Sequence, residues 1–242
     1  MSSDYQLNTE LIKENIQKVK EDIQKYSPYP EKVKLVVVTK YFDYNGVERV
    51  LEAGHNIVGE NKGQVIRDKE SYFNEKFQNF PNEKKDIQWH FIGNLQKNKI
   101  KYIVKYVDLI HSINRLSVAQ ELDKKAKEVG RVIDILLEIN IAGEESKEGY
   151  KLEELMLEIP EYLKLENLKV IGLMTMAQNT EDEEVLKSTF SKLRETKEIL
   201  NEKYFNNSLT ELSMGMSGDY KVALAEGATI IRVGTKIFEK EN

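Results

Sequence analysis

Residues 35–40 read Leu-Val-Val-Val-Thr-Lys, a short run of mostly β-branched side chains that ends on a lysine. Such a run is too short for a typical helix and is typical of a strand buried on both faces. Seven further apolar runs follow it: Ile57–Gly59, Gln88–Ile92, Leu109–Ile113, Ile133–Ile141, Val170–Met174, Glu211–Met214 and Thr229–Val233. Polar segments rich in Lys and Glu, with apolar residues at helical spacing, separate these runs. Eight strands alternating with helices predict an α/β protein, a single closed (β/α)8 barrel.

The rest of the chain fits one such domain over residues 1–242. Apolar residues at helical spacing, from Leu7 to Ile23, predict a leading helix within residues 1–27 that packs on the barrel, and Pro28 and Pro30 end it. No composition break or linker follows. An open doubly wound sheet is the alternative, but it would not need eight strands, and no GxGxxG motif follows the first one.

Composition excludes several functional classes. The chain has 242 residues, 40% hydrophobic and 32% charged, with a net charge of −5, which suits a packed domain without a general attraction to nucleic acid or anionic membranes. It has no cysteine, which excludes disulfides and thiol chemistry, and its three histidines lack metal-ligand spacing. The chain has no apolar stretch long enough for a membrane span and no signal peptide, so we expect a cytoplasmic protein.

Lys40 is the sharpest candidate for chemistry. In a (β/α)8 barrel, functional groups gather where strands end and βα loops begin, and Lys40 closes the first strand. An amine on the rim of an apolar floor is desolvated and becomes nucleophilic toward carbonyl carbons. The plainer interpretation is a solvated lysine at a strand end, and position alone leaves it open.

The last two predicted strands supply a candidate anion site. Gly234 and Thr235 follow the eighth strand, and Ser213 and Ser217 flank a glycine after the seventh. Barrels often bind phosphate around the loops of their last two strands, where backbone N–H groups and hydroxyls are available. Strands one and eight are neighbours in a closed barrel, so the Lys40 amine and this phosphate cup should lie within the length of one small ligand.

A lysine, a phosphate cup and Arg232 in the eighth strand together suggest pyridoxal 5′-phosphate. The aldehyde would form an imine with Lys40, and the phosphate would occupy the cup. Arg232 would reach the pyridine nitrogen. Since an arginine only donates hydrogen bonds, it favours an unprotonated pyridine, which is a weak electron sink.

Seven motifs along the chain are specific in combination: Val38-Thr39-Lys40, Gly59-Glu60-Asn61, Trp89–Gly93 with Leu95-Gln96 and Asn98-Lys99, Asn140 with Lys147 and Gly149, Gly172–Met176, Leu212–Ser217 and Arg232–Thr235. Together they resemble the motifs of the pyridoxal phosphate homeostasis protein family, whose fold is similar to the N-terminal barrel of alanine racemase. The resemblance covers nearly the whole chain.

The resemblance implies a role for each matching residue. Lys40 matches the imine lysine, and Arg232 matches the group at the pyridine nitrogen. Ser213 or Ser217, with Gly234 and Thr235, matches the phosphate site, and Asn61 lies beside the ring. It further implies a monomeric or weakly associating cofactor carrier in vitamin B6 balance, with no established catalytic turnover. We expect apo pyridoxal phosphate enzymes as possible partners, no metal and no catalytic residues. Tyr41-Phe42-Asp43 and Lys62-Gly63 depart from the pattern of many relatives, which affects two loops but not the lysine.

Two other functions stay open from the sequence. A racemase or lyase could use Lys40 as anchor and base, with His90 or Tyr41 as a second acid–base group, although His90 and Trp89 read more naturally as packing residues. Against an enzyme, the last predicted strand ends close to Asn242, so we expect no second domain to cover a substrate. A barrel for a sugar phosphate, without pyridoxal phosphate, is the third hypothesis.

Overall fold

The computed structural model describes residues 7–83, 85–141, 143 and 148–239. Its eight strands are β1 (Lys34–Val38), β2 (Ile57–Glu60), β3 (Gln88–Phe91), β4 (Val107–Ile113), β5 (Ile133–Glu138), β6 (Leu168–Met174), β7 (Glu211–Ser213) and β8 (Ile230–Val233). They form a closed barrel in sequence order, with every neighbouring pair parallel and β1 paired with β8. The predicted (β/α)8 barrel is therefore confirmed.

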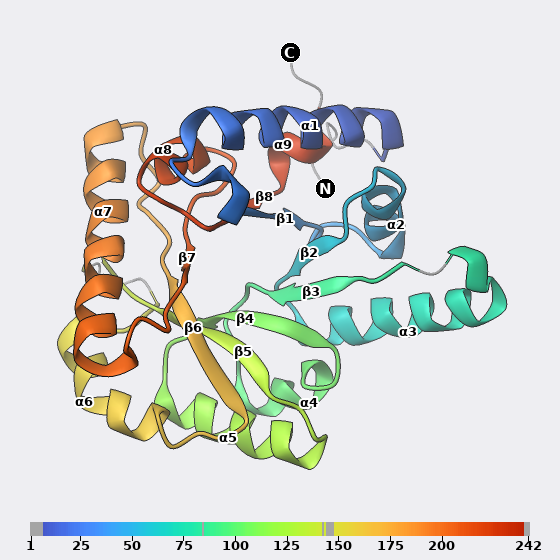
Figure 1. Ribbon diagram of the computed structural model, residues 1–242. Helices are drawn as coiled ribbons and strands as arrows, with labels where there is room; N and C mark the ends of the chain where they lie inside the picture. The colour runs from blue at the N-terminus through green and yellow to red at the C-terminus, as the bar shows by residue number, and fades with distance from the viewer. Residues whose placement is uncertain (1–6, 84, 142, 144–147, 240–242) are drawn as a thin grey trace.

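Helices follow the strands and surround the barrel (Figure 1). They are α1 (Thr9–Tyr26), α2 (Tyr44–Glu52), α3 (Gly63–Asn79), α4 (Ile100–Ile103), α5 (Leu116–Glu128), α6 (Leu152–Tyr162), α7 (Glu183–Leu200), α8 (Tyr220–Ala225) and α9 (Thr235–Phe238). A π-helical turn, Asn201–Phe205, extends α7. None of the helices in the described part of the chain is long and apolar enough to cross a membrane.

The leading helix α1 packs against α9, the last helix in the described part of the chain. The Asn8 side chain caps it by accepting hydrogen bonds from two backbone N–H groups of its first turn. Ile12, Ile16 and Val19 lie on its buried face, and α1 packs on α2, α8 and α9 (Figure 1). The buried Asn15 amide donates to the backbone carbonyls of Ile237 and Glu239, so α1 holds the last helix of the barrel directly.

The core has two layers because side chains alternate across each strand. A small cluster fills the barrel interior and includes Val36, Leu109, Leu136 and Ile230. A larger cluster lies between the strands and the surrounding helices. Polar side chains occupy the upper part of the interior, nearest the carboxyl ends of the strands, and they form the site described below.

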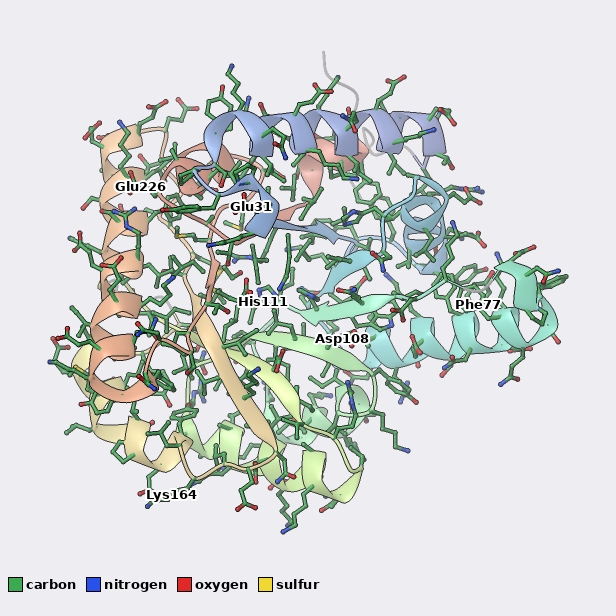
Figure 2. The ribbon with its side chains drawn as sticks, in the orientation of Figure 1. Glu31, Phe77, Asp108, His111, Lys164 and Glu226 are labelled. Atoms are coloured by element: carbon green, nitrogen blue, oxygen red, sulfur yellow. The ribbon has the colours of Figure 1, made fainter. Side chains whose placement is uncertain are left out.

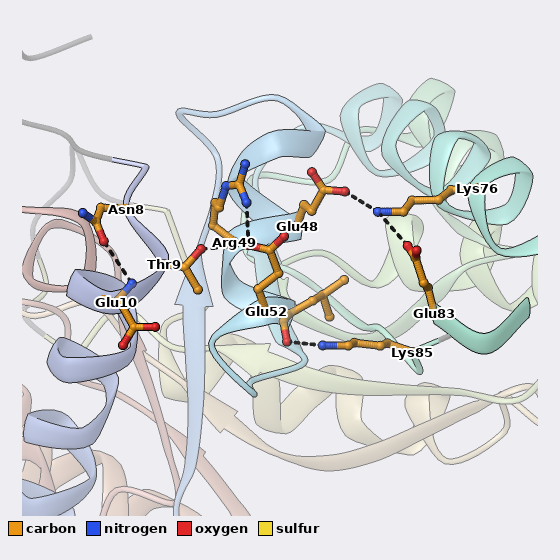
Figure 3. A network of polar contacts seen from close by, with 10 residues as sticks. Asn8, Thr9, Glu10, Glu48, Arg49, Glu52, Lys76, Glu83 and Lys85 are labelled. Atoms are coloured by element: carbon orange, nitrogen blue, oxygen red, sulfur yellow. Dashed lines mark hydrogen bonds and ion pairs between the residues drawn. The ribbon is translucent and has the colours of Figure 1, made fainter. Parts of the chain in front are cut away.

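Polar contacts link α2 to α3 and to the segment that follows α3 (Figure 3). The Lys76 ammonium lies 2.5 Å from a Glu48 carboxylate oxygen and 3.4 Å from one of Glu83, and the Lys85 ammonium donates to the Leu51 carbonyl. These groups are partly exposed, so each pair contributes at most about 1 kcal/mol to stability. They keep the βα units of β1 and β2 together.

Candidate functional site

Lys40 and Thr235 lie on the same rim of the barrel. β1 and β8 are parallel neighbours with Val37 opposite Val233, and Lys40 and Thr235 follow their carboxyl ends. Gly234 packs closely on the end of β1: a Cβ added to it would lie 3.2 Å from the Val38 Cβ, a tight contact. The absence of a side chain at position 234 therefore suits this close approach.

Lys40 follows the fully buried Thr39 and is itself half-buried. Its ammonium lies 5.0 Å from the centroid of the Tyr41 ring, which is half exposed. The aromatic ring provides a cation–π contact for the amine at the edge of the barrel mouth. A ligand that enters the barrel mouth therefore contacts this amine before it reaches the barrel interior.

A buried ion pair supports the backbone beneath Lys40. The Glu60 carboxylate accepts hydrogen bonds from the Thr39 hydroxyl at 2.6 Å and the Lys69 ammonium at 2.5 Å, and Lys69 also donates to the Thr39 carbonyl at 3.2 Å. Burial raises the pKa of Glu60, while Lys69 and Thr39 oppose that shift by favouring the carboxylate. The pair fixes the end of β1 against β2 and α3.

Ser217, Gly234 and Thr235 come together at the ends of β7 and β8. The Ser217 hydroxyl is half-buried and accepts a hydrogen bond from the Gly234 N–H at 3.3 Å. Thr235 is exposed and begins α9. This cluster offers two hydroxyls and backbone N–H groups, which are the donors that phosphate oxygens accept from.

Ser213 lies apart from this cluster. It is completely buried, and its hydroxyl contacts Arg232 at 2.6 Å and His111 at 2.8 Å. Of the two serines considered for phosphate, Ser217 therefore lies at the accessible rim and Ser213 lies in the interior.

Arg232 projects from β8 into the upper barrel and is 5% exposed. Its guanidinium donates to the Ser213 hydroxyl and, at 3.2 Å, to the Thr175 carbonyl just after β6. Burial lowers the pKa of Arg232 to about 10, and the carboxylates of Asp219 and Glu138 act in the opposite direction. Arg232 thus remains a cation at neutral pH, held at the level where the strands end.

The histidines of β3 and β4 meet inside the barrel, which their separation in the sequence did not indicate. His90 Nδ1 lies 2.9 Å from His111 Nε2, and both rings are buried. Figure 2 shows His111 among the strands at the centre of the molecule. Burial lowers the pKa of His90 to about 3 and that of His111 well below its usual value. Among the described residues, no group of three or more His, Asp or Glu side chains is placed to hold a metal ion.

Glu138 is a second group that sequence reasoning missed. It ends β5 inside the barrel, is 4% exposed, and accepts a hydrogen bond from the Asn114 amide at 3.2 Å. Burial raises the pKa of Glu138 to about 7, and the nearby Glu148 carboxylate acts in the same direction. Because the unfolded chain releases this proton near pH 4.5, ionisation of Glu138 opposes folding as the pH rises from there toward 7.

Replacing Glu138 with glutamine should remove this pH dependence. The difference in unfolding free energy between Glu138→Gln and the wild type is expected to be about 2–3 kcal/mol larger, in favour of the variant, at pH 8 than at pH 5. Urea denaturation at the two pH values measures the gain. Glu153→Gln, at an exposed position of α6, is the control. A gain that is equal at pH 5 and pH 8 would contradict the burial of an ionisable carboxyl.

Asn61 is half-buried and follows β2 directly. The next loop lies against its backbone, since a Cβ added to Gly93 would lie only 2.2 Å from the Asn61 carbonyl oxygen. Gly93 therefore lets this loop pack directly on the Asn61 backbone.

Of the remaining motif residues, Asn140 follows β5, whereas Lys147 lies outside the described part of the chain.

Comparison with known proteins places this barrel in a family. The family model of the alanine racemase N-terminal domain matches residues 7–240. A pyridoxal phosphate homeostasis protein of Synechocystis sp. is 39% identical over 209 residues, which cover 86% of this chain and 92% of that protein. One of Aquifex aeolicus is 49% identical over 154 residues, or 63% of this chain and 67% of that protein.

Solved structures agree with these relatives. PipY of Synechococcus elongatus, solved with pyridoxal phosphate bound, superposes with a TM-score of 0.83 at 30% identity, covering 94% of this chain and 99% of PipY. Alanine racemase of Clostridium difficile superposes with a TM-score of 0.67 at 15% identity, covering 94% of this chain and 57% of the enzyme, which shows a shared fold alone. The sequence motifs, the barrel and the relatives agree: this chain belongs to the pyridoxal phosphate homeostasis protein family.

Proposed function

We propose that this chain binds pyridoxal 5′-phosphate as an imine on Lys40 and acts as a carrier or reservoir in vitamin B6 balance. One observation carries the proposal: Lys40 and the Ser217–Gly234–Thr235 cluster lie on the same rim, at the ends of the paired strands β1 and β8. The names of the relatives support it, because they are pyridoxal phosphate homeostasis proteins, and PipY was solved with this cofactor.

The groups at the barrel mouth fit the chemistry of this cofactor. The Lys40 amine would bind the aldehyde carbon of the cofactor as an imine, with release of one water. The Ser217 hydroxyl and the N–H groups at the start of α9 would hold the phosphate. Arg232 would donate to the pyridine nitrogen, and Asn61 would lie beside the ring. The proposal needs no metal.

The same groups argue for carriage of the cofactor rather than turnover. Arg232 is a cation with only donors, so it favours an unprotonated ring nitrogen and a weak electron sink. The relatives are named for homeostasis and not for a reaction. On this proposal the protein has no catalytic residues, works as a monomer in the cytoplasm and passes the cofactor to apo enzymes that use it.

A racemase or lyase is the second candidate, because alanine racemase shares the fold and Tyr41 lies beside the Lys40 amine. A panel of amino acids added to cofactor-saturated protein separates the two functions. Steady racemisation, transamination or decarboxylation at a metabolic rate would favour the enzyme. Loss of the imine band without turnover would favour the carrier.

The decisive test of the site is borohydride trapping. Protein saturated with pyridoxal phosphate is reduced, which converts the C=N bond to a stable amine, and the tagged peptide is mapped by mass spectrometry. We expect the tag on Lys40. A tag on another lysine would reject the site. Protein that stays colourless and takes up no cofactor would reject the whole function in favour of the sugar phosphate barrel.

Ser217→Ala should weaken cofactor binding roughly tenfold, because it removes one hydrogen bond to a charged phosphate. Equilibrium titration of apoprotein with pyridoxal phosphate, followed by absorbance, measures the change. Ser191→Ala, at a half-buried position of α7 away from the barrel mouth, is the matched control and should bind as the wild type does. Unchanged affinity in Ser217→Ala would exclude its hydroxyl from the phosphate site.

A further inference from the structure

Four buried side chains form one continuous hydrogen-bonded chain across the barrel interior. Arg232 Nη1 lies 2.6 Å from Ser213 Oγ, Ser213 Oγ lies 2.8 Å from His111 Nδ1, and His111 Nε2 lies 2.9 Å from His90 Nδ1. These residues come from four strands, β8, β7, β4 and β3, and none is more than 5% exposed. We call this set the interior relay.

The direction of every hydrogen bond in the interior relay follows from its first member. A guanidinium only donates, so Ser213 Oγ accepts from Arg232. Among the described residues, His111 Nδ1 is the one other hydrogen-bond contact of this hydroxyl, so it takes the Ser213 hydrogen. His111 is then neutral with its proton on Nε2, and it donates that proton to His90 Nδ1. The low pKa values of both histidines agree with neutral rings.

A protonated His111 would break this order. Ser213 Oγ would then accept from both Arg232 and His111, and the Ser213 hydrogen would lose its acceptor. A buried donor without an acceptor costs about 1–3 kcal/mol. The neutral Nδ1 lone pair of His111 therefore takes the Ser213 hydrogen and fixes the orientation of the hydroxyl that accepts from Arg232.

A polar chain of this kind is not needed for packing. Apolar side chains fill the lower interior, and replacing buried polar groups with apolar ones of similar volume is often neutral or stabilising. The interior relay ends on Arg232, a cation at the level of the strand ends, whose other amino group donates to the Thr175 carbonyl. The interior relay can therefore act on the position of this guanidinium.

We propose that His111 is a positioning residue which, through Ser213, holds the Arg232 guanidinium where it meets the ring nitrogen of the bound cofactor. This inference rests on the proposed function. With Arg232 held, the ring nitrogen stays an acceptor and does not take up a proton. Without this hydrogen bond, the electrostatic attraction of Asp219 and Glu138 can draw the Arg232 guanidinium away from the ring nitrogen.

The experiment compares His111→Phe with His111→Asn. Asparagine places its side-chain oxygen close to where His111 Nδ1 lies and so retains the acceptor for Ser213, whereas phenylalanine removes it. We expect roughly tenfold weaker cofactor binding in His111→Phe. We also expect a pH transition in the bound-cofactor spectrum that the wild type lacks, because the ring nitrogen then titrates. His111→Asn should restore the wild-type affinity and spectrum.

Thr196→Val is the control, since it removes a buried hydroxyl of α7 that lies outside the interior relay and donates to the Lys192 carbonyl. It should leave the affinity and the spectrum unchanged. If His111→Phe does not fold, Ser213→Ala breaks the same link with a smaller residue and should give the same spectral change. If folded His111→Phe and Ser213→Ala both have the spectrum of the wild type, the inference is overturned. Absence of an imine in the wild type would instead overturn the proposed function.

Discussion

Lys40→Ala protein is expected to be colourless and to gain no imine absorbance when pyridoxal phosphate is added. The change removes the only atom of the residue that can form the C=N bond, while the barrel beneath it stays intact because the Lys40 side chain is half-buried at the rim. The spectrum of purified protein, before and after addition of the cofactor, measures the effect. Residual binding through the phosphate cluster should be reversible and leave no tag after borohydride reduction.

Two other lysines provide the control for this loss. Lys62 and Lys97 are exposed in the loops that follow β2 and β3, on the same rim as Lys40. Lys62→Ala and Lys97→Ala should both keep the imine band and the tag. A band that persists in Lys40→Ala, or vanishes in either control, would show that the amine at position 40 is not the anchor.

Lys69→Met should destabilise the fold by about 3–5 kcal/mol, the cost typical of leaving one partner of a buried ion pair alone. Lys69 is 4% exposed and Glu60 is fully buried. Of the buried side-chain polar atoms in the described residues, Glu60 Oε2 already has no hydrogen-bond partner. Without the Lys69 ammonium, the Thr39 hydroxyl and the more distant Lys40 charge would remain to stabilise the carboxylate. Urea denaturation followed by circular dichroism measures the loss.

The double variant Lys69→Met/Glu60→Gln tests the cause. If the buried charge is responsible, the double variant should recover much of the stability that Lys69→Met loses. Lys76→Met, which breaks a partly exposed pair with Glu48, should cost only about 1 kcal/mol or less. Similar losses in Lys69→Met and Lys76→Met, or no recovery in the double variant, would contradict the assignment of a buried pair.

The sequence predicted the barrel well because each strand is a recognisable run of apolar residues. Runs such as Val36-Val37-Val38 are buried on both faces, so they carry a continuous apolar signal, and the eight runs match the eight strands. The fifth run was predicted too long: β5 ends at Glu138, and Ile139 only bridges to Tyr150. Apolar residues continue past the strand because Ile139 is buried and Ile141 half-buried in the loop, and composition alone does not separate them from strand residues.

The site could be predicted only in part. Lys40 and Gly234 follow strand ends, which are visible in the sequence, and the structure brings them together. The interior relay was invisible because His90, His111 and Ser213 meet through the stagger of a closed barrel and not through any spacing. A one-residue change in register would turn His111 away from the interior. The alternation along β4, which puts Leu109 and His111 on one face, indicated only that these two residues point the same way and not which residues His111 contacts.

The two hydrogen bonds from Asn15 join the first helix of the chain to the last. Its amide holds the carbonyls of Ile237 and Glu239, and α9 begins at Thr235, beside the half-buried Ser217 hydroxyl. The segments around Asn15 and Ile237–Glu239 must therefore meet before that corner of the mouth becomes rigid. During synthesis, the face of α1 that receives α9 stays uncovered until β8 and α9 have been made, so we expect cofactor binding only once these elements have folded against α1.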